Sequence, residues 1–317
     1  MKAVFLDLDS LACDDLDLTE LQAQCDEFIG YPTTQSAQVA ERIATAEVVI
    51  VNKVVLDGAM LAKAKQLKHI CIAATGTNNV DLLAASEQGI SVSNCQGYGT
   101  ASVAQHVMTL MLALHTNLIA YNQAARAGQW ARAKQFCLLD YPIQELKGKT
   151  LGIVGYGNLG AGVAQLAGAF GMQVLVAQRI GGDTVAGRVA LDELLPQVDV
   201  LSLHCPLTEQ TRNLMDAARI AQMKTGAFLI NAARGGIVNE ADLADALRGG
   251  KLAGAATDVL TEEPPINGNP LLADDIPNLI ITPHSAWGSV EARQRIVEQL
   301  TETVAGLKQG NLIRVVN

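Results

Sequence analysis

Hydrophobic positions along the chain form short apolar runs that alternate with longer stretches of mixed character. In the first hundred residues the apolar runs are KAVFLDL (2–8), EVVIVN (47–52), HICIAA (69–74), ISVSN (90–94) and a shorter run near 27–30. Polar segments with helical spacing, such as 57–67 and 80–88, lie between them. Strands separated by helices imply crossovers and a parallel sheet. We therefore predict an α/β unit in this part of the chain.

A second series of apolar runs begins at Thr150. Its members are 150–155, 172–177, 199–204, 227–232, 253–259 and 279–283. Six strands is the number in a complete dinucleotide-binding sheet. Between the two series, apolar residues from Thr100 to about Gly128 recur at three- and four-residue spacings, which predicts one long helix, and 289–307 is predicted to be an amphipathic helix.

Composition narrows the class of protein. A chain of 317 residues with 49% hydrophobic and 17% charged residues is long enough for two domains and is not largely disordered. The net charge of −9 and the absence of a basic cluster argue against a nucleic-acid or anionic-membrane partner. The six cysteines form no C-x-x-C pair, so neither a zinc site nor a disulfide framework is indicated, and no metal is expected.

The chain shows no targeting or membrane signal. Acidic residues interrupt the apolar run at the N-terminus, and the most apolar stretch, 107–114, is far shorter than the ~20 residues that span a bilayer. We expect a soluble, cytoplasmic protein.

The first run of the second series leads into a glycine-rich turn. Gly155-Tyr-Gly157-Asn158-Leu159-Gly160 lies between an apolar strand and a helical segment, which is the context that a dinucleotide-binding G-x-G-x-x-G motif needs. The first glycine allows a tight turn, the second lets the backbone approach a pyrophosphate, and the third lets the helix pack on the strand. The motif predicts dinucleotide binding, and a purely structural turn is the alternative.

The end of the next strand bears on which dinucleotide is bound. An acidic residue is expected there to bind the ribose 2′-hydroxyl, but the chain has Gln178 followed by Arg179. Gln178 can bond a hydroxyl without repelling a phosphate, and Arg179 can pair with a 2′-phosphate. Arg179 can equally stack on adenine or point into solvent. We favour NADP(H), or dual use, over strict NAD(H).

Three ionisable residues follow predicted strands of the second series: Arg234, Glu263 and His284. In open α/β sheets, ligands bind outside the carboxyl ends of the strands, so these side chains are expected to meet at one site. An arginine fork binds a carboxylate, a histidine transfers a proton near neutral pH, and a glutamate beside it favours the imidazolium form. This set suits hydride reduction of a 2-keto acid.

From about Asn52 to Arg295 the sequence resembles the D-isomer-specific 2-hydroxyacid dehydrogenases. The motifs that carry the resemblance are GYGNLG (155–160), HCPLTEQTRNLMD (204–216), FLINAARGGIVNEADLADAL (228–247), DVLTEEPP (258–265) and TPHSAWGS (282–289). Within that family, the chain looks like the hydroxypyruvate reductase/glycerate dehydrogenase branch, on the segments NKVVLD (52–57), ATGTNNVDL (74–82) and GYGTASVAQH (97–106).

The resemblance implies roles for single residues. Arg234 matches the substrate-binding arginine, Glu263 the catalytic glutamate, and His284 the acid/base histidine. Asp258 matches the aspartate that holds the nicotinamide carboxamide. Substrate-binding positions are implied at Thr75, Gly76 and Tyr98. Further cofactor-lining positions are implied at Asn158, Leu159, His204, Thr211, Ala232 and Ala233.

The resemblance also implies the layout. Two Rossmann-like parallel-sheet domains are expected: a dinucleotide-binding domain at 99–285, and a flavodoxin-like substrate domain made of 1–98 and 286–317. In relatives, the long helix after Thr100 builds a two-fold dimer. The apolar stripe of that helix fits this role, and it also fits packing within one chain.

The activity implied is interconversion of a small 2-keto acid and its D-2-hydroxy acid, with hydroxypyruvate or glyoxylate as the favoured substrate. Phosphoglycerate and D-lactate enzymes share this chemistry and remain alternatives. A formate dehydrogenase relative would carry Gln at the Glu263 position. A nucleotide-sensing binding protein on the same fold is an alternative of another class.

Overall fold

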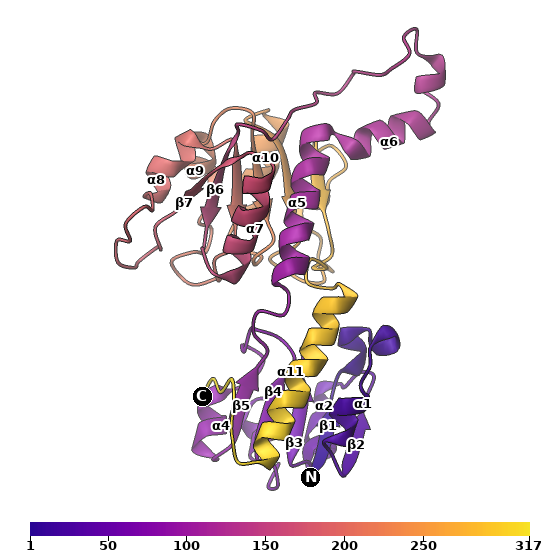
Figure 1. Ribbon diagram of the computed structural model, residues 1–317, viewed down its shortest axis with the longest axis vertical. Coiled ribbons are helices and arrows are strands. Elements are labelled where there is room, and N and C mark those ends of the chain that lie inside the picture. Colours follow the sequence, from indigo (N-terminus) through magenta and orange to yellow (C-terminus); the bar gives the residue numbers. More distant parts are fainter. The chain divides into compact units, whose positions relative to one another are not determined.

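The computed structural model describes residues 1–317, which form two compact units. Unit 1 comprises Met1–Gly99 and Gly288–Asn317, and unit 2 comprises Thr100–Trp287 (Figure 1). The chain therefore passes from one unit to the other twice, and each unit is described by itself below.

Unit 1 is built on a five-stranded parallel sheet. Its strands are β1 (Lys2–Phe5), β2 (Glu27–Gly30), β3 (Val48–Val51), β4 (His69–Ile72) and β5 (Ser91–Asn94). They lie in the order β2-β1-β3-β4-β5, which is the flavodoxin-like order. The strand expected near 27–30 is present. All residues of β3 and β4 are buried, as a central parallel strand covered on both faces requires.

The helices of unit 1 are α1 (Thr19–Ala23), α2 (Ser36–Ile43), α3 (Gly58–Leu61), α4 (Leu82–Glu87) and α11 (Val290–Lys308). Helix α11 is capped by Ser289, whose side chain accepts a hydrogen bond from the backbone N–H of Ala292. The buried Arg293 of α11 donates to both carboxylate oxygens of Asp15, at 2.7 and 2.8 Å. These contacts attach the C-terminal helix to the first residues of the chain.

Unit 2 contains six parallel strands. They are β6 (Thr150–Val154), β7 (Gln173–Val176), β8 (Val200–Leu203), β9 (Ala227–Asn231), β10 (Leu252–Thr257) and β11 (Leu279–Ile281), in the order β11-β10-β9-β8-β6-β7. A parallel bridge between Ala177 and Val189 adds a short further pairing next to β7. With this bridge the order is that of a Rossmann sheet with one added edge strand. The chain reverses direction across the sheet at β6 and β8, and dinucleotides bind at such a switch point.

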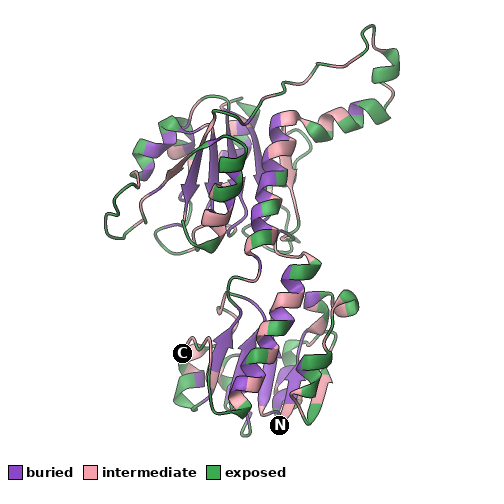
Figure 2. Cartoon of the chain, viewed as in Figure 1, coloured by how far each residue is buried: buried purple, intermediate pink, exposed green.

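Helices cover the sheet of unit 2. Its four central strands, β6, β8, β9 and β10, are largely buried, whereas the outer strands β7 and β11 are partly exposed (Figure 2). One hydrophobic cluster packs beneath α8 (Leu191–Leu194), α9 (Ala217–Gln222) and α10 (Glu240–Arg248). The other packs beneath α5 (Thr100–Thr116) and α7 (Asn158–Ala169). A Cβ at Gly162 would lie 3.4 Å from Ala104 Cβ, so this glycine allows α7 to pack closely on α5.

The single helix expected from Thr100 to about Gly128 is two helices. Helix α5 ends at Thr116 and α6 (Leu118–Arg126) begins after Asn117, which has a φ of 49°. The two helices are bent by 60°, and α6 with the segment that follows it extends away from the sheet of unit 2 (Figure 1). No single helix has the length and apolar character of a membrane span, although this bent pair together meets both criteria.

Candidate active site

The glycine-rich turn joins β6 to α7. Gly155 has a φ of 94°, and a Cβ there would lie 2.5 Å from the backbone nitrogen of Cys205. A Cβ at Gly160 would lie 2.2 Å from the carbonyl oxygen of Gly155. Both positions therefore need glycine for the fold itself. A Cβ at Gly157 would meet nothing within 4 Å, so this glycine leaves open space beside the N-terminus of α7.

Helix α7 begins at Asn158, and Leu159 follows in its first turn. Gly157 precedes the helix and supplies no side-chain cap to the first N–H groups. Uncapped N–H groups and the helix dipole favour an anion at this position. The turn thus fits the pyrophosphate of a dinucleotide.

The structure gives the Gln178 side chain backbone partners that the sequence did not predict. Its side-chain nitrogen donates to the carbonyl oxygens of Val185 and Arg188, at 2.9 and 3.3 Å, and its side-chain oxygen accepts from the backbone N–H of Val185 at 3.0 Å. The amide holds the loop after β7 in place, which leaves one lone pair of Oε1 for a ribose hydroxyl.

Two arginines belong to this loop. The side chain of Arg179 lies against Gly182, where a Cβ would approach Arg179 Cδ to 2.8 Å. The guanidinium of Arg188 lies 6.0 Å from the ring centroid of Tyr156, in the glycine-rich turn. Sequence reasoning missed Arg188, because no spacing rule connects a residue in the middle of a loop with that turn.

The loop after β8 contributes His204 and Thr211. Burial lowers the pKa of His204 to about 4, so its imidazole is neutral at neutral pH. Its Nε2 lies 2.9 Å from Ser202 Oγ, and its Nδ1 is buried without a hydrogen-bond partner. The Thr211 hydroxyl donates to the carbonyl oxygen of Pro206 and accepts from the N–H of Thr208, both at 2.7 Å, which stiffens the loop.

Arg234 follows β9 by three residues, after the buried Ala232 and Ala233. Asn231, at the end of β9, donates to the carbonyl oxygen of Arg234 at 3.0 Å and accepts from the N–H of Ala233 at 3.1 Å. This amide, which sequence reasoning did not single out, fixes the turn that carries the arginine. One terminal nitrogen of Arg234 donates to the carbonyl oxygen of Ala233 at 2.7 Å.

The turn after β9 packs on the loop after β10. A Cβ at Gly235 would lie 1.8 Å from the carbonyl oxygen of Leu260, so only glycine fits there. Leu260 is also joined to Glu263, whose Oε1 accepts from the Leu260 N–H at 2.8 Å. The loops that carry Arg234 and Glu263 are thus in direct contact.

Glu263 and His284 are hydrogen-bonded to each other. His284 Nδ1 lies 2.6 Å from Glu263 Oε2, and about a third of each side chain is exposed, 34% for His284 and 35% for Glu263. The N–H of His284 donates to the carbonyl oxygen of Asp258 at 2.8 Å. The structure therefore brings together two of the three residues expected to form the catalytic set, and places the third on the neighbouring loop.

Asp258 is 2% exposed and follows β10. Its Oδ1 accepts from Thr282 Oγ1 at 2.6 Å and from the N–H of Ser285 at 2.9 Å, and its Oδ2 accepts from the N–H of Ala286 at 2.9 Å. In this chain the carboxylate binds the loop around His284, and Oδ2 retains one lone pair for a further donor.

The other substrate-binding residues expected from the sequence lie in unit 1. Thr75 Oγ1 donates to the carbonyl oxygen of Cys95 at 3.0 Å, and the Asn94 amide donates to the Thr75 carbonyl at 2.7 Å. Gly76 follows in the same loop after β4. The carbonyl oxygen of Tyr98 accepts from Arg295 Nε at 2.8 Å. No group of three or more His, Cys, Asp or Glu side chains is arranged to hold a metal ion.

Residues 108–286 match the family model described as D-isomer specific 2-hydroxyacid dehydrogenase, NAD binding domain. The chain belongs to this family. It is 43% identical to the glycerate dehydrogenase of Methylorubrum extorquens over 316 residues, which cover 99% of this chain and 98% of that one. It is 38% identical to the hydroxypyruvate reductase of Blautia hydrogenotrophica, with 100% of both chains covered.

The fold agrees with solved structures. The crystal structure of the TT0316 protein from Thermus thermophilus superposes with a TM-score of 0.85 at 32% identity, with 100% of both chains covered. As a D-2-hydroxyacid dehydrogenase, the chain is an oxidoreductase with a nicotinamide-dinucleotide-binding domain in unit 2. The expected fold class, two parallel-sheet α/β domains of Rossmann type, is confirmed.

Proposed function

We propose that this dehydrogenase reduces hydroxypyruvate or glyoxylate to the corresponding 2-hydroxy acid, of the D configuration where the product is chiral. The observation that carries the proposal is the 2.6 Å pair of His284 and Glu263, which lies on loops after β11 and β10 at the carboxyl edge of a dinucleotide-binding sheet. The names of the two relatives favour this substrate class within the family.

The pair supplies the proton. Because His284 Nδ1 faces Glu263, the Nε2 atom is left to donate to the substrate oxygen. The Glu263 carboxylate stabilises the imidazolium that donates, and it keeps the ring in one orientation. A reduced nicotinamide, when bound, supplies the hydride that the keto carbon accepts.

Arg234 binds the substrate carboxylate. One terminal nitrogen of its guanidinium is occupied by the Ala233 carbonyl, and the edge formed by Nε and the other terminal nitrogen remains for a bidentate contact. Positive charge at this position also polarises the adjacent keto group. By resemblance, Thr75, Gly76 and Tyr98 of unit 1 are proposed to bind substrate as well.

For the cofactor, we propose use of NADP(H), alone or together with NAD(H). Gln178 replaces the acidic residue that would repel a 2′-phosphate, and Arg179 and Arg188 place two cations on the loop after β7. Proposed cofactor contacts at the turn are Gly155, Gly157, Asn158, Leu159 and Gly160. Proposed contacts on the other loops are His204, Thr211, Ala232, Ala233 and Asp258.

Initial rates test the proposal directly. Hydroxypyruvate, glyoxylate, pyruvate, phosphohydroxypyruvate and a bulkier keto acid are each assayed with NADH and with NADPH. We expect the highest kcat/KM with hydroxypyruvate or glyoxylate. A preference for pyruvate or for phosphohydroxypyruvate would contradict the proposed substrate and favour a D-lactate or phosphoglycerate enzyme. The absence of turnover with every keto acid would favour a nucleotide-sensing binding protein. A strong preference for NADH would show that neither arginine reaches a phosphate.

Arg234→Ala tests the carboxylate contact. We expect kcat/KM to fall roughly 10²–10³-fold, because the variant removes a charged donor at the reacting centre. Binding of the dinucleotide, followed by its fluorescence, should change little. Turnover near that of the unchanged protein would contradict the role of Arg234.

We also propose a homodimer. The apolar residues of α5 are buried within unit 2 and are not available for an interface. We therefore assign the proposed interface to the segment that follows α5. That segment exposes Leu118, Ile119, Trp130, Phe136, Leu139 and Ile143.

We further propose a cytoplasmic location. All six cysteines are free thiols, as expected in a reducing compartment.

A further inference from the structure

The loop that carries His284 has a backbone conformation that neighbouring groups must maintain. His284 has a φ of 52°, in the left-handed region that residues other than glycine seldom adopt. Such a conformation persists where several contacts over-determine it. The contacts around this loop therefore decide where the imidazole lies.

Most of the hydrogen bonds of this loop are made to Asp258. Asp258 accepts hydrogen bonds from the Thr282 hydroxyl and from the backbone N–H groups of Ser285 and Ala286 through its carboxylate. Its own carbonyl oxygen accepts from the N–H of His284. The position of the imidazole thus follows the position of a buried carboxylate and the hydroxyl beside it.

Helix α5 holds this assembly from the other side. His106 Nε2 lies 3.0 Å from Thr282 Oγ1 and 3.6 Å from Asp258 Oδ1. The single hydrogen of the Thr282 hydroxyl is directed to Asp258, so the hydroxyl oxygen accepts from His106. His106 therefore carries a proton on Nε2 and donates it to the Thr282–Asp258 pair.

A second side chain of α5 reaches the opposite end of the loop. Ser102 Oγ donates to the carbonyl oxygen of Ala286 at 2.7 Å. Ser102 and His106 are four residues apart and so lie on one face of the helix. One helix face thus contacts both ends of the segment 282–286, with His284 between the two contacts.

We propose that His106 is a positioning residue for His284, acting through Thr282 and Asp258. The inference deepens the proposed keto-acid reduction and rests on the role of His284 in it. Without the His106 donor, the loop samples other conformations and the His284–Glu263 pair forms for a smaller fraction of the time. The ionisable groups around the ring and its loop are Glu263, Asp258 and His106, with Arg234 on the loop after β9.

Three variants test the inference in the full-length protein. His106→Leu removes the donor, and His106→Gln keeps an N–H donor near the Nε2 position. Gln105→Leu makes a similar apolar change at an exposed neighbouring position of α5 and serves as the matched control. We expect His106→Leu to lower kcat roughly 10–100-fold, because misplacement of a reacting group by about 1 Å costs that much. KM for the dinucleotide should stay nearly constant, His106→Gln should recover most of the rate, and Gln105→Leu should match the unchanged protein.

A second measurement separates this inference from the proposed function. The ring proton of His284 is followed by NMR against pH in the protein without cofactor or substrate, and is identified by its absence in His284→Asn. In His106→Leu we expect the ring to lose its proton at lower pH than in the unchanged protein, because it is paired with Glu263 less often. In His106→Gln the titration should stay where it was. Thr282→Val removes the hydroxyl between His106 and Asp258, and we expect it to give the same result as His106→Leu. It replaces His106→Leu in both measurements if the His106→Leu protein fails to fold.

The outcomes are distinct. Failure of the unchanged protein to reduce any keto acid overturns the proposed function, and the NMR titration still decides the role of His106. Normal turnover and an unshifted His284 titration in His106→Leu overturn the inference and leave the proposed function standing. Equal losses in His106→Leu and His106→Gln overturn the donor role.

Discussion

At the residue scale, burial lowers the pKa of three histidines outside the catalytic pair: His69, His115 and His204. Burial lowers the pKa of His69 and of His204 to about 4. His69 is fully buried, its Nδ1 lies 2.5 Å from Ser91 Oγ, and its Nε2 has no partner. Protonation would place an unpaired N–H and a charge in the core of unit 1, so the neutral form is strongly preferred.

The consequence is a pH dependence of stability. An unfolded histidine has a pKa of about 6.5, so between pH 6.5 and 4 the unfolded chain binds the proton that the folded chain excludes. Stability is complete above pH 6.5 and falls as the pH drops toward 4, by about 1–2 kcal/mol at pH 5 from His69. His69→Asn retains a bonding atom for Ser91 and removes the titration. We expect its Tm to fall less between pH 7.5 and pH 5.0 than that of the unchanged protein; equal falls would contradict the assignment.

Single residues were predictable where a motif fixes both the residue type and its place at a strand end. Glu263 and His284 were predicted as partners on this basis, and the structure shows them bonded. The ribose contact expected of Gln178 stays a prediction, but the sequence did not reveal that its amide is also bonded to backbone groups seven and ten residues further on. Asn231 was not singled out, and His106 was interpreted as structural or exposed. The partners of both residues belong to other turns and helices, which no local pattern in the chain reveals.

At the element scale, the strands were predicted well and one helix was not. Short apolar runs predicted the strands, and all eleven strands of the structure lie within or beside the runs expected from the sequence. The helix after Thr100 has a continuous apolar spacing, which concealed the break at Asn117. What the spacing could not show is that the first part of this stripe is buried on α7 while the residues beyond the break are left exposed.

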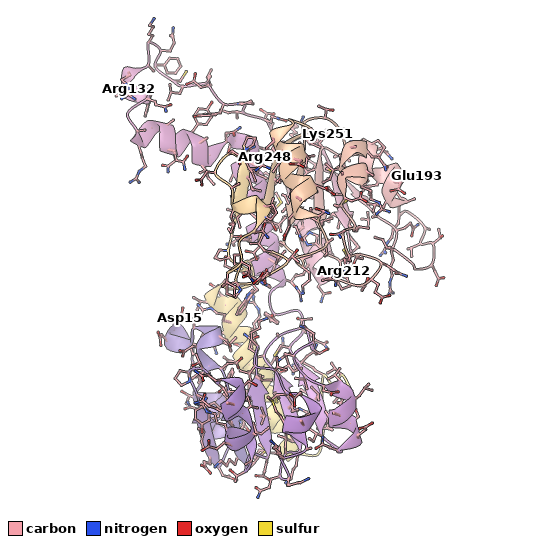
Figure 3. The ribbon with its side chains drawn as sticks, turned by 180° about the vertical axis from the view of Figure 1, so that it is seen from behind. Asp15, Arg132, Glu193, Arg212, Arg248 and Lys251 are labelled. Carbon is pink, nitrogen blue, oxygen red and sulfur yellow. The ribbon has the colours of Figure 1, made fainter.

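The segment after the break is where we expect subunits to meet. Phe136 is 89% exposed and Leu139 is 74% exposed, and Arg132 lies on the same segment (Figure 3). Exposed apolar groups clustered on one segment indicate an interface. Phe136→Asp with Leu139→Asp should convert a dimer to a monomer in light scattering without changing the circular dichroism. Leu83→Asp, at a leucine of α4 that is 79% exposed, should leave the dimer intact. A monomeric unchanged protein would contradict the proposed interface.

At the scale of the whole molecule, each unit has a hydrophobic core of its own. The two clusters of unit 2 contain only residues between Thr100 and Trp287, and the cluster of unit 1 contains none of these. The sequence indicated two α/β series, but the membership of the last helix came from resemblance, because an amphipathic helix carries no sign of which sheet it covers.

We therefore expect residues 100–287 alone to fold and to bind a dinucleotide. The measurements are cooperative thermal unfolding and titration of NADH or NADPH by fluorescence. Gly157→Val is the matched control. A Cβ there would meet nothing in the protein within 4 Å, so we expect the fold to persist while the added bulk blocks the approach of a pyrophosphate. An unfolded fragment would show that unit 2 depends on the rest of the chain.

Attachment of the final helix to unit 1 has a consequence for biosynthesis. The guanidinium of Arg293 holds Asp15, the N–H of Val316 donates to the Val92 carbonyl at 2.8 Å, and the Asn317 side chain accepts from the N–H of Val92 at 2.8 Å. A ribosome releases the first ninety-nine residues long before it makes these partners, whereas everything that unit 2 needs emerges in one uninterrupted stretch. Residues 1–99 are therefore translated before unit 2, but the unit to which they belong is completed only after residues 288–317 have been made.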